Sequence, residues 1–142
     1  MYQKILLALD ATDAGRALVA HVRELAAFHH SKLVLVHVAD GWAARNFDAL
    51  KLAESEEMKK DREYLDATAN DLRSAGFEVE TQLALGNPPT EILKTAESLH
   101  CDLIAMTTHG HRLFKDLLFG STIEPVRHRA SVPVLLVRAS GK

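Results

Sequence analysis

The sequence predicts an α/β domain in which a parallel β-sheet is covered by helices on both faces. Short apolar runs alternate with helical patterns along the whole chain, and most of these runs are continuous rather than alternating. A continuous apolar run is typical of a strand that is buried on both faces, as in a parallel sheet. Right-handed crossovers between such strands give a doubly wound, Rossmann-like sheet.

Five segments are predicted to be strands, namely residues 4–9, 33–38, 77–85, 102–106 and 132–137. The third segment alternates between apolar and polar side chains, which indicates one exposed face and a place at an edge of the sheet. We expect the strand order 3-2-1-4-5, in which the third and fifth strands lie at the two edges.

Four helices are predicted between these strands. The first covers about residues 13–28, where apolar side chains recur at helical spacing after an N-cap threonine. The second begins near Asp48 and ends at Gly76, and the third follows the Gly-Asn-Pro-Pro-Thr turn at 86–90. The fourth begins near Ser121 and leads to the last strand. Strands and helices therefore alternate throughout.

The composition indicates one domain over residues 1–142 with an ample core, since 47% of the residues are hydrophobic. A formal net charge of −2 gives no general attraction to nucleic acid or to a membrane surface, which favours a small-molecule partner. No apolar run approaches the roughly 20 residues of a membrane-spanning helix, and none is typical of an export signal. With the single cysteine Cys101, these features predict a cytoplasmic protein.

Polar residues follow three of the predicted strands at their carboxyl ends. Asp10 follows the first strand, residues 37–40 end the second, and residues 107–110 follow the fourth. In open α/β sheets, ligands bind beyond the carboxyl ends of the strands, where the strand order reverses direction. The first and fourth strands flank that point, so we expect these three segments to form one crevice.

The loop at residues 107–122 has the composition of a phosphate-binding loop. Gly110 and Gly120 let backbone N–H groups approach an anion, and a helix that begins near Ser121 adds unpaired N–H donors. A second interpretation needs no ligand: Ser121 and Glu124 also form a capping box, and the glycines then serve as turn residues. The sequence alone leaves both interpretations open.

These features resemble the universal stress protein family, in its nucleotide-binding branch. The hallmark of that branch is Gly-x-x-Gly, nine residues, then Gly-Ser or Gly-Thr, which Gly110, residues 111–119 and Gly120-Ser121 match. The first hallmark glycine is replaced by Thr107. Further matches are Asp10 with Thr12, the Leu-Val-His-Val strand, the turn at 86–88, the Asp-Leu-Ile-x-Met strand and the closing Val-Pro-Val-Leu-Leu-Val.

The resemblance implies a site for ATP, with ADP and AMP as alternatives and magnesium or manganese carried by the nucleotide. It assigns to this site Ala8, Leu9, Asp10, Val38, Met106, Thr107, Gly110, Gly120, Ser121 and Thr122. Asp10 is expected on the ribose or adenine side, and Val38 is expected to hold adenine through its backbone. Residues 110 and 120–122 are expected to hold phosphates, and Thr107 either narrows the site or donates a hydrogen bond.

Nothing in the sequence marks a metal site or a catalytic base. The pair His109 and His111 has no further ligands nearby, so we assign no metal to it. Phosphoryl transfer to water needs a positioned base and a metal anchor, and neither is evident. We therefore expect binding to be the main activity, with slow ATP hydrolysis at most, and leave open whether the protein is an enzyme.

The resemblance implies a cytoplasmic, nucleotide-dependent regulator of the stress response. It also implies a homodimer through residues 132–138, because this strand commonly pairs across a dimer axis in the family. A second hypothesis is a dimeric interaction module that does not depend on nucleotide, since this apolar strand at an edge would otherwise leave backbone groups unpaired. A flavoprotein-like dinucleotide binder is less favoured, because the chain has no second domain.

Overall fold

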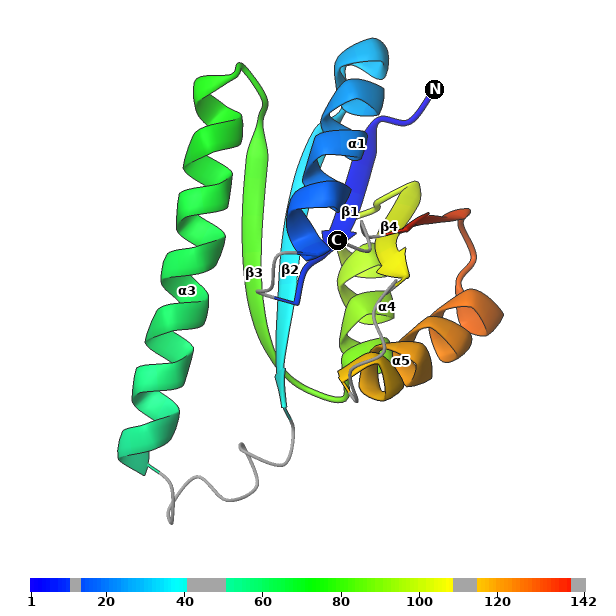
Figure 1. Cartoon of the computed structure of the whole chain (residues 1–142). Coiled ribbons are helices and arrows are strands. Elements are labelled where there is room, and N and C mark those ends of the chain that lie inside the picture. Colours follow the sequence, from blue (N-terminus) through cyan, green and yellow to red (C-terminus); the bar gives the residue numbers. More distant parts are fainter. Residues whose placement is uncertain (11–13, 41–50, 109–114, 139–142) are drawn as a thin grey trace.

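A computed structural model of the chain describes residues 1–10, 14–40, 51–108 and 115–138 (Figure 1). The elements are β1 (Lys4–Ala8), α1 (Ala14–His29), β2 (Lys32–Asp40), α3 (Lys51–Ser74), β3 (Val79–Gly86), α4 (Pro88–Ser98), β4 (Leu103–Thr108), α5 (Lys115–Arg129) and β5 (Val134–Arg138). The five strands form one parallel sheet in the order β3-β2-β1-β4-β5. The predicted strand order and the two predicted edge strands are therefore confirmed.

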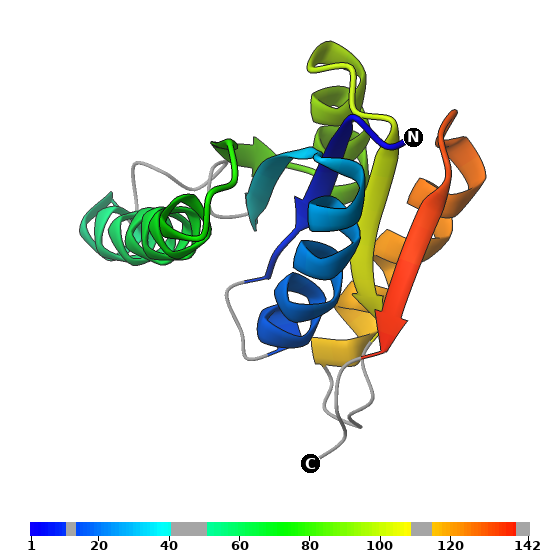
Figure 2. The ribbon, with the colours of Figure 1, turned by 90° about the horizontal axis from the view of Figure 1, so that it is seen from above.

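Helices cover both faces of the sheet, as the continuous apolar runs predicted (Figure 2). Helices α1 and α3 lie on one face, where α3 covers β2 and β3 and α1 reaches β4 and β5. Helices α4 and α5 lie on the other face and pack against each other. No helix in the described ranges is long and apolar enough to cross a membrane.

Successive residues of β1 point into two separate hydrophobic cores. Ile5 and Leu7 belong to the core below α1 and α3, whereas Leu6 and Ala8 belong to the core below α4 and α5. All four side chains are buried. Because each face of β1 lies against helices at residues 5–8, these positions are apolar without a break, and the one polar residue of the strand, Lys4, stands at its amino end.

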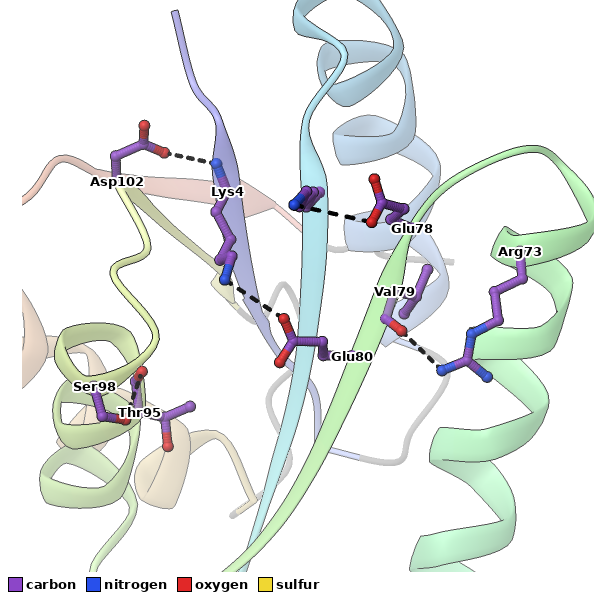
Figure 3. A network of polar contacts seen from close by, with 9 residues as sticks. Lys4, Arg73, Glu78, Val79, Glu80, Thr95, Ser98 and Asp102 are labelled. Atoms are coloured by element: carbon purple, nitrogen blue, oxygen red, sulfur yellow. Dashed lines mark hydrogen bonds and ion pairs between the residues drawn. The ribbon is translucent and has the colours of Figure 1, made fainter.

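The amino end of β1 is held by polar contacts (Figure 3). The carboxylate of Asp102 accepts the backbone N–H groups of Gln3 at 2.9 Å and Lys4 at 3.1 Å. The ammonium group of Lys4 lies 3.5 Å from a carboxylate oxygen of Glu80 on β3, so this ion pair reaches across β2. These contacts fix the end of the sheet opposite to the predicted ligand crevice.

Helix α5 begins earlier than the sequence predicted. We expected a start near Ser121, but the helix spans Lys115–Arg129, so Gly120 and Ser121 lie inside it. The capping-box interpretation of Ser121 and Glu124 is therefore wrong in this structure, because Ser121 is not an N-cap. The helix-favouring residues before Gly120 extend the helix through it, although a glycine inside a helix costs roughly 0.5–1 kcal/mol relative to alanine.

Candidate functional site

The strand register leaves the carboxyl end of β1 short of both neighbouring strands, at the position of the predicted crevice. Pairing of β1 with β2 ends at Ala8 and Val36, and pairing of β1 with β4 ends at Leu7 and Ala105. Both neighbouring strands continue, β2 to Asp40 and β4 to Thr108. Figure 1 shows β2 running well past the end of β1. The predicted crevice is therefore bounded by β2 and β4 as its two walls and by the end of β1 as its floor.

The backbone of Val38 faces this crevice. The N–H group of Leu9 donates to the carbonyl of Val36 at 2.8 Å, so the backbone polar groups of Val36 point toward β1. Backbone groups of successive strand residues point to opposite sides, so those of Val38 point the same way as those of Val36. Because the β1 pairing has already ended at Val36, the N–H and C=O groups of Val38 face the crevice.

The backbone of Thr107 faces the crevice from the opposite wall. The N–H group of Ile104 donates to the carbonyl of Pro133, which precedes β5, at 3.1 Å. By the same alternation, the backbone groups of Ala105 and Thr107 point toward the β1 side, and β1 pairing has ended at Ala105. The side chain of Thr107 is buried, with the residue 2% exposed, as is that of its neighbour Met106. Thr107 therefore turns its backbone toward the crevice and buries its side chain.

Leu9 and Asp10 form the floor of the crevice. Leu9 is buried, and both of its backbone polar groups are held by β2, because its carbonyl accepts a hydrogen bond from the Nδ1 atom of His37 at 2.9 Å. Asp10 follows directly and is half-buried. The structure therefore brings Ala8, Leu9, Asp10, Val38 and Thr107 together at the carboxyl ends of β1, β2 and β4, and their role in binding stays a prediction.

Helix α3 contributes a residue to this region that the sequence analysis missed. The Nε2 atom of His37 lies 3.1 Å from the Oδ2 atom of Asp61, and the two side chains are only 13% and 12% exposed. Asp61 lies in the charged run of residues 54–63, a pattern that is typical of a solvated helix face. The signal was present, because Asp61 precedes Leu65 by one helical turn and continues the buried stripe that Leu65 and Ala69 form.

A close contact between α3 and α1 lies next to this pair. A Cβ atom added to Gly15 would stand 2.6 Å from the hydroxyl oxygen of Tyr64 and 3.4 Å from a methyl carbon of Leu9. A side chain at position 15 would therefore have to displace Tyr64, because α3 approaches the first turn of α1 through this residue. The carboxyl end of β1, the start of α1 and the middle of α3 are packed together at the crevice.

The structure describes only some of the residues that are predicted to bind phosphate. Gly110 lies outside the described residues, as do His109 and His111. Gly120, Ser121 and Thr122 lie within α5, and Thr122 is buried. N–H groups beyond the first turn of a helix are used in intrahelical hydrogen bonds, so the predicted donors at 120–122 are not at a helix start here. Their role in phosphate binding stays a prediction.

The single cysteine lies at the other end of the sheet. Cys101 is buried just before β4, and this burial raises the pKa of its thiol from 9.0 to about 11. The thiol therefore stays protonated at neutral pH, and a buried, protonated thiol is a poor nucleophile. Within the described parts of the chain, no three histidine, cysteine, aspartate or glutamate side chains are grouped so that they could hold a metal ion.

Comparisons with known proteins agree with this fold. The sequence profile of the Universal stress protein family matches residues 1–138. Universal stress protein MJ0577 of Methanocaldococcus jannaschii is 30% identical, and the match covers 97% of this chain and 96% of that protein.

Solved structures give the same result. The structure of MJ0577 superposes with a TM-score of 0.83 at 26% identity and covers 100% of this chain and 99% of that one. Two structures that are less similar in sequence share the fold. One is a universal stress protein in complex with cAMP, with a TM-score of 0.69, 21% identity and 98% coverage of both chains. The other is the universal stress protein from Archaeoglobus fulgidus in complex with dAMP, with a TM-score of 0.71, 22% identity and coverage of 96% of this chain and 98% of that one. The sequence profile and the whole-chain relative show that this chain belongs to the universal stress protein family.

Proposed function

We propose that the protein binds an adenine nucleotide in the crevice beyond the end of β1. The observation that carries the proposal is the orientation of two backbone segments: Val38 and Thr107 turn their N–H and C=O groups toward the crevice from its two walls. A planar base between these walls can form hydrogen bonds with main-chain groups that no strand occupies. Asp10 on the floor is then placed for the ribose or adenine side.

The backbone of Val38 favours adenine over guanine. Adenine offers a donor at N6 beside an acceptor at N1, and a strand residue offers a C=O and an N–H group that match them. Guanine reverses this pattern, with an acceptor at O6 beside a donor at N1. In the same position, the N–H group of Val38 would face the N1–H group of guanine, and its C=O group would face O6, so neither hydrogen bond could form. Support also comes from the fold, because the two related structures with cAMP and dAMP are complexes with adenine nucleotides.

The phosphates of ATP, ADP or AMP are proposed to lie toward the start of α5. Gly110, Gly120, Ser121 and Thr122 would hold them through backbone N–H groups, as in the hallmark of the family. Donors at 120–122 become available if the helix begins near Ser121 in the nucleotide complex. The described residues hold no cluster of three metal-binding side chains, so magnesium or manganese would be carried by the phosphates.

We further propose that the protein acts as a nucleotide-dependent regulator of the stress response in the cytoplasm, and that it forms a homodimer through residues 132–138. A second candidate function is a dimeric interaction module that does not depend on nucleotide. It is favoured by the edge strand β5, in which Leu136 is 37% exposed and its apolar neighbours are half-buried. An open apolar edge of this kind is a ready partner for a second strand.

Calorimetry on protein stripped of carried-over nucleotide tests the proposal. ATP, ADP and AMP, each with magnesium, are expected to bind, and GTP is expected to bind more weakly. Sedimentation in the absence and presence of ATP then separates the two candidate functions. A dimer with no measurable affinity for any adenine nucleotide would support the interaction module and rule out the nucleotide site.

A further inference from the structure

The imidazole ring of His37, which lies on β2, contacts the end of β1 and helix α3. Its Nδ1 atom contacts the carbonyl of Leu9 at the end of β1, at 2.9 Å. Its Nε2 atom contacts the carboxylate of Asp61 on α3, at 3.1 Å. The backbone of His37 itself pairs with Leu83 of β3. One side chain therefore links the floor of the crevice to the long helix beside it.

The two contacts fix the orientation of the ring. A carbonyl oxygen can only accept a hydrogen bond, so Nδ1 of His37 is the donor to Leu9. The Nε2 atom then faces Asp61, and a single proton between these two atoms completes the second hydrogen bond. A carboxylate on one ring nitrogen sets the direction in which the other nitrogen points. Asp61 thus orients the ring, and the ring holds the carbonyl of Leu9.

Holding this carbonyl also fixes the backbone at Asp10. The carbonyl of Leu9 and the N–H group of Asp10 belong to the same planar peptide unit. Leu9 is held on its other side as well, because its N–H group donates to the carbonyl of Val36 at 2.8 Å. With both groups of Leu9 held by β2, the nitrogen and Cα atoms of Asp10 are positioned by the same peptide plane.

Stability alone does not account for this pair. Two polar side chains at 13% and 12% exposure lose much of their hydration. Replacing such a pair by apolar residues of similar volume is often neutral or stabilising, so a buried pair is weak evidence for a role in stability. His37 is also adjacent to Val38, whose backbone faces the crevice, which favours a role in the geometry of the site.

We propose that His37, oriented by Asp61, is a positioning residue of the nucleotide site. It does not contact the nucleotide. It holds the peptide between Leu9 and Asp10 so that Asp10 meets the ribose or adenine, and it ties α3 to the floor of the crevice. This inference rests on the proposed adenine-nucleotide site and assigns the residues that arrange it.

Three variants and one matched control test the proposal by calorimetry with ATP. His37→Leu removes both contacts and is expected to weaken binding by about tenfold. His37→Asn places an amide donor near the position of Nδ1 and is expected to recover part of the loss. Asp61→Asn keeps an acceptor for the ring and is expected to have a smaller effect than His37→Leu. If the loss of affinity came only from a loosened fold, His37→Asn would not restore it. Recovery of ATP affinity in His37→Asn therefore supports the loss of the donor to Leu9 as the cause.

The control is Asp102→Asn, which weakens the hold on β1 at its opposite end, where Asp102 accepts the N–H groups of Gln3 and Lys4. It is expected to lower the free energy of unfolding but to leave ATP affinity within about twofold of the wild type. If His37→Leu bound ATP as the wild type does, or lost no more affinity than Asp102→Asn, the proposal would be overturned.

A second measurement separates this proposal from the nucleotide site itself. In the nucleotide-free protein, the backbone amide of Leu9, which donates to the carbonyl of Val36, is expected to exchange with solvent faster in His37→Leu than in the wild type, and at the wild-type rate in Asp102→Asn. A wild type that binds no adenine nucleotide removes the proposed function, whereas unchanged exchange at Leu9 and normal ATP binding in His37→Leu remove the positioning role alone. If His37→Leu does not fold, Asp61→Asn and His37→Asn supply both measurements.

Discussion

The hydroxyl oxygen of Tyr64 on α3 lies directly over Gly15 in α1, 2.6 Å from the point where a Cβ atom of residue 15 would stand. Real Cβ atoms do not approach other atoms so closely, so alanine at this position must push Tyr64 away. The contact joins the two helices on one face of the sheet beside the candidate nucleotide site.

Gly15→Ala is therefore expected to destabilise the protein by roughly 1–3 kcal/mol, because overpacking outweighs the helical preference for alanine. The ring carbon that carries the hydroxyl lies 3.9 Å from the added Cβ, an ordinary contact, so the hydroxyl alone causes the clash. In a Tyr64→Phe background, Gly15→Ala is expected to be neutral or stabilising. Urea unfolding of the wild type, the two single variants and the double variant gives the coupling energy between the two positions. A coupling energy near zero would contradict the predicted clash.

Val38→Pro tests whether the backbone of Val38 recognises the base. The N–H group of Val38 points to the side of β2 where pairing with β1 has ended, so its loss breaks no ladder hydrogen bond. We expect nearly unchanged stability together with a loss of ATP affinity of about tenfold or more.

The matched variant is Ala39→Pro, one residue along the same strand. The N–H group of Ala39 points to β3, with which Ala39 pairs at Leu85. This change is expected to cost about 1–3 kcal/mol of unfolding free energy through the lost ladder hydrogen bond. Thermal melts and calorimetry on both proteins make the comparison, and equal effects on stability would show that Val38 does not face an open side of the strand.

Cys101 gives a pH dependence whose sign follows from its environment. Burial raises the pKa of the thiol from 9.0 to about 11, so the folded protein retains this proton longer than the unfolded chain does. The stabilising contribution is complete below pH 9 and is lost as the pH rises toward 11, with a total on the order of 2–3 kcal/mol. Comparison with Cys101→Ala in urea unfolding at several pH values isolates this slope. Parallel pH profiles of the two proteins would mean that the thiol is not desolvated by the fold.

The strands were predictable because their physical signal is local. In the run of residues 5–9 every position is apolar, which is typical of a strand covered on both faces. Strand order then followed from the handedness of the crossovers and from the alternating pattern of residues 77–85, which is typical of an edge. The crevice followed from the order, since strand ends in a parallel sheet meet at one edge.

The His37–Asp61 contact was not predictable in the same way. The spacing of four residues that places Asp61 on the buried stripe of α3 is visible in the sequence. Its partner His37 is distant in the chain, so the contact depends on how α3 packs against the sheet. The start of α5 was missed for a different reason. Local signals at Gly120, Ser121 and Glu124 indicate a helix start, while the helix-favouring residues before them extend the helix to Lys115.

Pro125 lies inside α5, four residues after the helix start that the sequence predicts at Ser121. With the helix spanning Lys115–Arg129, Pro125 is an interior residue that removes the hydrogen bond to the carbonyl of Ser121. Pro125→Ala is then expected to raise the free energy of unfolding by about 3 kcal/mol, the difference between proline and alanine inside a helix. If Ser121 were the N-cap instead, Pro125 would stand at N4, whose N–H group is also the partner of the Ser121 carbonyl, so part of this gain is expected with either start. An unchanged free energy of unfolding in Pro125→Ala would contradict a helix through this position.

The same variant connects this helix to nucleotide binding. Alanine at position 125 favours the longer helix, in which the N–H groups at 120–122 are used within the helix. If phosphate needs these groups, Pro125→Ala is expected to weaken ATP binding while it stabilises the free protein, and to change the affinity for adenosine little because adenosine has no phosphates. Calorimetry with both ligands and urea unfolding without ligand make the test. A stabilised variant with unchanged affinity for ATP would show that the N–H groups at 120–122 do not hold the phosphates.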